Sequence, residues 1–140
     1  MSNIISKVPI AVNESILSYR PGSKEKEGVL KQYKTLFENP VEIKMRIGDK
    51  DVETGNISIM CPPHDHQHKL GFYHKANKKN IETAIDCALD AKKRWSKMPW
   101  ESRAAIFLKA ANLVAGPYRY KINAATMIAQ SKTIYQAEID

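Results

Sequence analysis

The chain has 140 residues, 43% hydrophobic and 26% charged, with 22 Lys and Arg against 15 Asp and Glu for a formal net charge of +7. Its apolar runs are all shorter than the roughly 20 residues that cross a bilayer, and the first seven residues lack the apolar core of a signal peptide. These features exclude a membrane protein and predict a globular protein in the cytoplasm.

The first 40 residues predict an arm followed by a helix. Residues 1–22 include Pro9 and have no sustained period, so we expect them to be extended. Ser23 can cap a helix over residues 23–39, which Asn39-Pro40 ends. The apolar residues of that helix recur on one stripe: Val29, Leu30, Tyr33, Leu36 and Phe37.

The hydrophobic period changes to two after Pro40. Apolar and polar residues alternate over residues 41–47, as in a strand with one wet face. Turn residues at 48–51 and 54–56 separate strand segments at Val52 and at residues 57–61, and a further strand follows Pro62-Pro63 at residues 70–74. We therefore predict a small antiparallel sheet over residues 41–75.

The region from residue 77 to residue 140 predicts three to four helices. Asn77 can cap the first, Pro99 separates it from the second, and Gly116-Pro117 ends the second. A third helix covers residues 118–130, and we expect its inward side chains to be Ile122, Ala125, Thr126 and Ala129. The fold class predicted for residues 1–140 is one α+β segment, mainly α, with a small antiparallel sheet.

A last helix begins after Ser131-Lys132-Thr133, where Ser131 or Thr133 can act as its cap, and reaches Asp140 without a C-terminal cap. Isolated helices shorter than roughly 12 residues are marginal in water. We therefore expect the chain to be a piece of a longer protein.

Histidines in the middle of the chain offer one candidate metal site. His64, His66 and His68 would share one face if the segment were a strand, and His74, Cys61 and Asp65 are near in sequence. The spacing matches none of the usual structural zinc patterns, and Pro62-Pro63 predicts a loop instead. We expect adventitious metal binding at most, and a metal protein stays an alternative hypothesis.

Other residues give no candidate catalytic or cofactor-binding group. Cys61 and Cys87 lack an electropositive setting and are expected to be free, structural thiols. We expect the helix carboxylates to be solvated: Glu82, Asp86, Asp90, Glu101 and Glu138. The chain has no Gly-rich strand-to-helix turn, Walker loop, nucleophile elbow or His-Glu-x-x-His motif. The prediction is no catalytic, cofactor-binding or metal residue.

The net charge raises the alternative of a stand-alone basic module that binds RNA or an acidic partner. The lysines are interleaved with Asp and Glu, and no nucleic-acid motif accompanies them, so solvated helix faces are the better interpretation. These lysines are Lys24, Lys26, Lys31, Lys34, Lys78, Lys79, Lys92 and Lys93.

The helical half carries a recognisable pattern in residues 81–95, Met98-Pro99 and residues 103–111. In that pattern a helix ends in an aromatic residue, a Pro turn follows, and an Arg-Ala-x-Ile-(Phe/Leu)-x-Lys-Ala-Ala helix comes next. It resembles the N-terminal part of the aldehyde dehydrogenase superfamily. Further segments are similar to the 1-pyrroline-5-carboxylate dehydrogenase branch: residues 12–14, 19–23, 63–69, 115–119 and 131–140.

The resemblance implies a parent enzyme with NAD as cofactor. In this branch a cysteine thiolate attacks the aldehyde, hydride passes to NAD⁺, and the thioester is hydrolysed, which converts L-glutamate γ-semialdehyde into glutamate in proline catabolism. The Rossmann domain and the catalytic residues of the family lie beyond the part that resembles this chain. We therefore expect an inactive, structural segment whose partner is the remainder of the parent chain, in a homo-oligomer that binds neither nucleic acid nor membrane.

Overall fold

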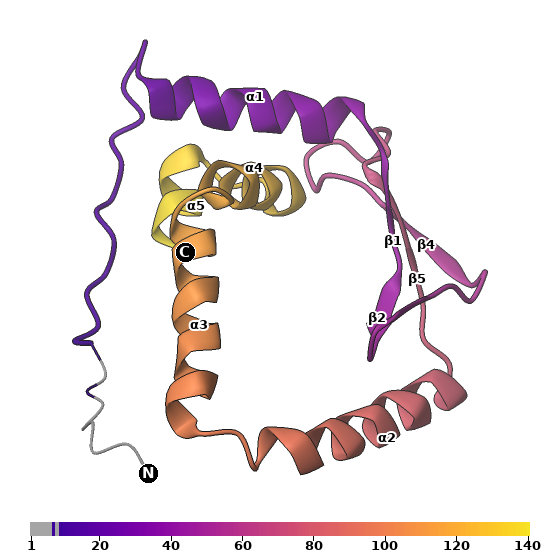
Figure 1. Ribbon diagram of the computed structural model, residues 1–140. Coiled ribbons are helices and arrows are strands. Elements are labelled where there is room, and N and C mark those ends of the chain that lie inside the picture. The colour runs from indigo at the N-terminus through magenta and orange to yellow at the C-terminus, as the bar shows by residue number, and fades with distance from the viewer. Residues whose placement is uncertain (1–6, 8) are drawn as a thin grey trace.

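The structure is a computed structural model that describes Lys7 and residues 9–140. Residues 1–6 and 8, which hold most of the segment that lacks a signal-peptide core and the start of the expected arm, lie outside these residues. Figure 1 shows an open frame in which α1, the strands, α2 and α3 follow one another around the edge, with α4 and α5 inside it beside α1. The elements are α1 Lys24–Glu38, β1 Val41–Ile43, β2 Met45–Ile47, β3 Lys50–Val52, β4 Ile57–Met60, β5 Gly71–His74, α2 Lys78–Trp95, α3 Trp100–Ala115, α4 Arg119–Gln130 and α5 Ile134–Ile139.

The helix starts predicted from capping residues are confirmed. Ser23 Oγ accepts a hydrogen bond from the backbone N–H of Lys26, which satisfies one of the unpaired donors at the start of α1. Asn77 forms a reciprocal capping box with Asn80 at the start of α2, and Thr133 forms one with Gln136 at the start of α5.

The strand arrangement differs from the single antiparallel sheet expected over residues 41–75. Residues 41–47 form two strands, separated at Lys44, that belong to different sheets: β2 pairs antiparallel with β3, while β1 lies in a second sheet of order β1-β5-β4. Strand β5 is antiparallel to β4 but parallel to β1. The parallel pairing depends on Gly71, since a Cβ at that position would lie 1.9 Å from the carbonyl oxygen of Val41.

The buried core lies where the arm, α1 and α4 meet. Tyr19, Val29 and Ala124 form its fully covered part. Partly buried side chains surround them: Leu17, Tyr33, Leu36, Tyr120, Met127 and Ile134. The stripe predicted for α1 is therefore mostly correct, although its Leu30 is 49% exposed.

The predicted inward face of α4 is wrong for this structure. Ile122, Ala125 and Ala129 are exposed and Thr126 is half-buried, whereas Asn123, Ala124 and Ile128 are buried. The helix has apolar residues on two sides, so the period alone could not select the side that packs on α1.

Helices α2 and α3 contrast with the core, because within their residues 78–95 and 100–115 no side chain is buried. Their large apolar side chains are exposed to solvent: Ile81, Ile85, Leu89, Trp95, Trp100, Ile106, Phe107, Leu108, Leu113 and Val114. Within the described ranges, each helix lacks the length or the apolar character that a bilayer crossing requires.

We predict that Gly28→Val destabilises the chain by about 2 kcal/mol, because it overpacks the contact between α1 and α4. A Cβ at Gly28 would lie 2.6 Å from two ring carbons of Tyr120. Urea denaturation measures the loss. Lys31→Val, an exposed position of the same helix, is the matched control, and equal stability of the two variants would contradict the prediction.

Candidate functional site

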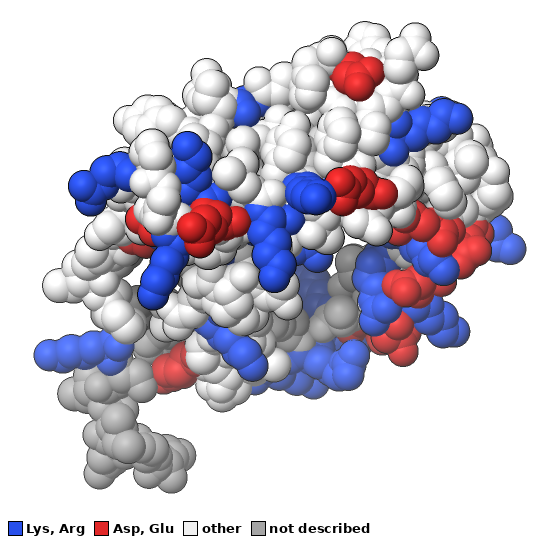
Figure 2. Space-filling view, turned by 90° about the horizontal axis from the view of Figure 1, so that it is seen from above, with Lys and Arg blue, Asp and Glu red and all other residues white. Residues whose placement is uncertain are grey.

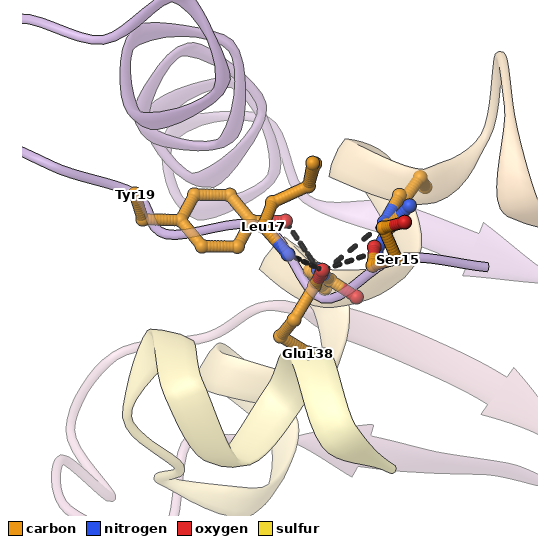
Figure 3. Close-up of polar contacts among 6 residues, drawn as sticks. Ser15, Leu17, Tyr19 and Glu138 are labelled. Carbon is orange, nitrogen blue, oxygen red and sulfur yellow. Dashed lines mark hydrogen bonds and ion pairs between the residues drawn. The ribbon is translucent and has the colours of Figure 1, made fainter.

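A buried carboxylate in α5 joins three distant parts of the chain (Figure 3). Glu138 accepts hydrogen bonds from the backbone N–H of Leu17 at 2.7 Å, from the hydroxyl of Tyr19 at 2.6 Å and from the amide of Asn123 at 2.7 Å. Arg119 forms an ion pair with the same carboxylate, whose side chain is 1% exposed. We call these five residues the Glu138 cluster.

Two further hydrogen bonds fix the partners of Glu138. The Nδ2 of Asn123 also donates to the Tyr19 hydroxyl oxygen at 3.0 Å, so the hydroxyl both donates and accepts. The guanidinium of Arg119 reaches past Glu138 to the carbonyl oxygen of Ser15 at 2.7 Å. The arm is therefore attached to α4 and α5 through both backbone and side-chain groups.

The electrostatics of the cluster favour a charged Glu138. Burial alone raises the pKa of this carboxyl, but the hydrogen bonds from Arg119, Tyr19, Leu17 and Asn123 outweigh that effect and hold the pKa below its usual value. The hydrogen bond to Glu138 raises the pKa of Arg119. Burial, with the adjacent carboxylate, raises the pKa of Tyr19 to about 12.

The prediction that Glu138 is solvated is therefore wrong, because its partners come from the arm and from α4, which no local pattern in α5 reveals. The other four carboxylates of that prediction are exposed, as expected: Glu82, Asp86, Asp90 and Glu101. Arg119 and Asn123 were not among the site residues predicted from the sequence. A polar Asn between apolar residues of a helix was the available signal, since a buried amide needs hydrogen-bond partners.

The histidines are not brought together around one point. His64 Nδ1 lies 2.7 Å from the Oγ of Ser131, whereas the Nε2 of His68 lies 2.7 Å from the carbonyl oxygen of Phe37. The ring of His68 also stacks on the ring of Phe37 at 3.7 Å. His66 is exposed in the loop. These contacts attach the loop of residues 62–69 to the ends of α1 and α4.

A different group could in principle hold a cation where the two sheets meet. The carboxylates of Glu42 and Glu53 and the ring of buried His74 offer ligand atoms within 4.8 Å of one another. Lys44 already lies there, with its Nζ 2.5 Å from Glu53 and 3.9 Å from Glu42. This contact raises the pKa of Lys44 and lowers the pKa of Glu53.

The hydrogen bonds of His74 fit poorly with a metal at this point. Its Nδ1 accepts from the backbone N–H of Thr54 at 3.2 Å, so the ring proton lies on Nε2, 2.9 Å from Glu42. A metal on Nε2 would move that proton to Nδ1, where it would face the N–H of Thr54. The arrangement suits an ion-pair junction better than a metal centre.

Both thiols occupy half-buried positions and are free, in agreement with the prediction from the sequence.

The basic side chains are mixed with acidic ones on the face that Figure 2 shows. Pairs such as Lys78 with Glu82, at 3.8 Å, and Lys93 with Asp90, at 3.2 Å, lie on exposed helix faces.

Comparison with known proteins gives consistent matches. The family model described as "Aldehyde dehydrogenase family" matches residues 50–140. A probable delta-1-pyrroline-5-carboxylate dehydrogenase of Schizosaccharomyces pombe is 47% identical over 96% of the chain, and the enzyme of that name from Agaricus bisporus is 45% identical over 96%. The chain spans 25% of the length of each of these relatives.

The solved structures agree with this result. A crystal structure of delta-pyrroline-5-carboxylate dehydrogenase from Mycobacterium tuberculosis, bound with NAD and cobalamin, matches the whole chain with a TM-score of 0.96 and 37% identity. The match covers 26% of that protein. The fold class predicted from the sequence, a helix-rich α+β segment of the N-terminal part of this fold, is confirmed.

We predict that Glu138→Gln destabilises the chain by about 3 kcal/mol, because it leaves the Arg119 charge without its buried partner. Urea denaturation gives the free energy of unfolding. Glu82→Gln removes an exposed carboxylate from a helix and is the control, with an expected change below about 0.5 kcal/mol. Similar effects of the two substitutions would contradict the structural importance of the cluster.

The lowered pKa of Glu138 predicts a loss of stability in acid. A carboxyl whose folded pKa lies below its unfolded value of about 4.3 stabilises the fold fully above that value, and the stabilisation is lost as the pH falls through the folded pKa. Urea midpoints measured from pH 7 downward should fall below about pH 4 more steeply for the original chain than for Glu138→Gln. Parallel curves would show that another carboxyl is responsible.

For the junction of Glu42, Glu53 and His74 we predict no stabilisation by metal. Chelator-treated chain should keep its Tm, and equimolar Zn²⁺ should leave the Tm unchanged because Lys44 and the Nε2 proton occupy the ligand positions. Thermal unfolding followed by circular dichroism checks this. A Zn²⁺-dependent rise in Tm that Glu42→Gln removes would identify a metal site.

Proposed function

This chain belongs to the aldehyde dehydrogenase family, and we propose that it supplies the N-terminal segment of an NAD-dependent 1-pyrroline-5-carboxylate dehydrogenase. The reaction oxidises L-glutamate γ-semialdehyde to glutamate and reduces NAD⁺, as a step of proline catabolism. The observation that carries the proposal is the similarity along almost the whole chain to enzymes of this name.

The exposed apolar helices support a structural role for the segment. Fully burying one large apolar side chain is worth roughly 1.5–3 kcal/mol, so α2 and α3 as they stand leave a large stabilisation unused. A cofactor-binding and catalytic body packed on these helices would recover it. The segment itself would contribute the frame and the Glu138 cluster, and neither the nucleophile nor the cofactor site.

The remaining predictions are parts of the same proposal. We propose a homo-oligomeric parent enzyme, to be tested by light scattering of the full-length protein. A cytoplasmic location stays a prediction, and the names of the Dictyostelium discoideum and mouse relatives include the word mitochondrial.

The interleaved ion pairs on the helix faces lend no support to the alternative, a basic module for RNA or an acidic partner.

A chimera tests the proposal. Residues 1–140 replace the matching segment of the Schizosaccharomyces pombe relative, and NADH formation is followed with glutamate semialdehyde and NAD⁺. We expect activity within about tenfold of the intact relative, since 1.4 kcal/mol of misfit at the joined surfaces corresponds to a factor of ten. The 140-residue chain alone should give no NADH.

Two outcomes would contradict the proposal. One is a folded but inactive chimera under conditions in which the intact relative is active. The other is turnover by the purified 140-residue chain, which would place a nucleophile and a cofactor site within it. A relative carrying an unrelated helical segment of equal length in place of the matched one is the negative control.

A further inference from the structure

Helix α3 has the composition of an interior helix. Its large apolar side chains recur at steps of one as well as at steps of seven, so they occupy more than half of the helix circumference: Trp100, Ile106, Phe107, Leu108, Leu113 and Val114. Each is more than one-third exposed, and Phe107 is 67% exposed. A helix that is apolar on most sides is normally enclosed by protein on most sides.

The chain covers only part of α3. The arm passes beside it, and a cavity of about 100 Å³ lies between Lys7 and Pro9 of the arm and Trp100, Ala104 and Leu108 of α3. The C-terminal end of α3 contacts α4. Figure 1 shows the arm along one side of α3, and it shows α2 extending away from the N-terminal end of α3. The side that carries Ile106, Phe107 and Val114 stays open.

Helix α2 also exposes apolar side chains. Ile81, Ile85 and Leu89 lie one helical turn apart and are all more than half exposed. A cavity of about 370 Å³ between α2 and β2 is lined by Ile81, Ile85 and Ile47. A second cavity, of about 630 Å³, lies at the end of α2 beside Trp95 and Met98. We call the exposed apolar side chains of α2 and α3 the frame surface.

The geometry of the frame surface favours one kind of partner. At about 1.5 Å per residue the 16 residues of α3 reach about 24 Å, short of a bilayer core of about 30 Å. A second copy related by a two-fold axis would cover one patch on each subunit. The frame surface lies on two helices that form two sides of the frame, so a partner that covers both helices must be a larger body.

The chain is also tied to itself at both ends. The hydrogen bond from Leu17 N–H to Glu138 joins residues that are 121 positions apart, and it places the arm beside α5. Tyr19 and Arg119 strengthen the same link. The contacts that organise the arm, α1, α4 and α5 therefore lie within the chain, whereas the large apolar side chains of α2 and α3 are left exposed.

We propose that this chain is a self-closed unit whose frame surface binds the cofactor and catalytic body of the dehydrogenase without needing a peptide bond to it. The inference rests on the proposed function, and the relatives supply the occupant, since about three-quarters of their length lies outside the matched part. Assembly of the two pieces as separate polypeptides is the direct consequence.

Co-expression tests the inference. The 140-residue chain carries an affinity tag, and its partner is the Schizosaccharomyces pombe polypeptide without its matching segment. We expect the two to co-purify in equal amounts and to form NADH from glutamate semialdehyde and NAD⁺. Phe107→Glu should reduce co-purification at least about tenfold, because a buried charge on the frame surface costs well over 1.4 kcal/mol.

The controls separate docking from folding and from function. Lys109→Glu changes the charge on a polar position of the same helix and should leave co-purification unchanged. Circular dichroism of Phe107→Glu should match the original chain, because Phe107 is already exposed in it.

Three results would contradict the docking inference or distinguish it from the proposed function. Failure of the two pieces to co-purify, while the covalent chimera is active, overturns the inference and leaves the proposed function standing. Self-association of the chain that persists in the presence of the body also overturns the inference. Co-purification with an inactive chimera and an inactive complex supports docking and counts against the proposed function.

Discussion

The folded arrangement depends on the need to satisfy one buried negative charge. A carboxylate removed from water is strongly unfavourable unless hydrogen bonds and a counter-charge replace its hydration. Glu138 obtains them only when the arm, α4 and α5 are all in place, because its donors are a backbone N–H, a phenol, an amide and a guanidinium from those segments. The charge of Glu138 is therefore fully compensated only when the arm, α4 and α5 are packed together.

This condition also accounts for an unusual backbone conformation. Tyr19 has a φ of 46°, in the left-handed region that residues with a Cβ rarely adopt, at a cost of roughly 1–2 kcal/mol. The turn directs its ring into the core beside Val29 and its hydroxyl toward Glu138. Burial of the ring and the two hydrogen bonds of the hydroxyl offset the strain, so the arm enters the core at one defined residue.

The features that could be predicted from the sequence are those decided within a few residues. Ser23, Asn77 and Thr133 start helices because each side chain bonds a backbone N–H three residues on, and Pro99 and Gly116 flank α3 for equally local reasons. Burial of Glu138, the parallel pairing of β1 with β5 and the choice of face on α4 depend on residues 30 to 121 positions away. Alternation and helical period carry no information about such distant partners, which is why these predictions failed. The absence of a catalytic group was argued from missing motifs, and it stays a prediction about function.

The hydrogen bond between Leu17 and Glu138 also has a consequence for the order of events during synthesis. At roughly 5–20 residues per second, α5 leaves the ribosome on the order of ten seconds after the arm. Until then Leu17 and Tyr19 have no carboxylate to bind, and α1 has no α4 to cover Val29. The arm, although it is made before α4 and α5, is thus among the last segments to reach its final position, and for that interval it is open to chaperones and proteases.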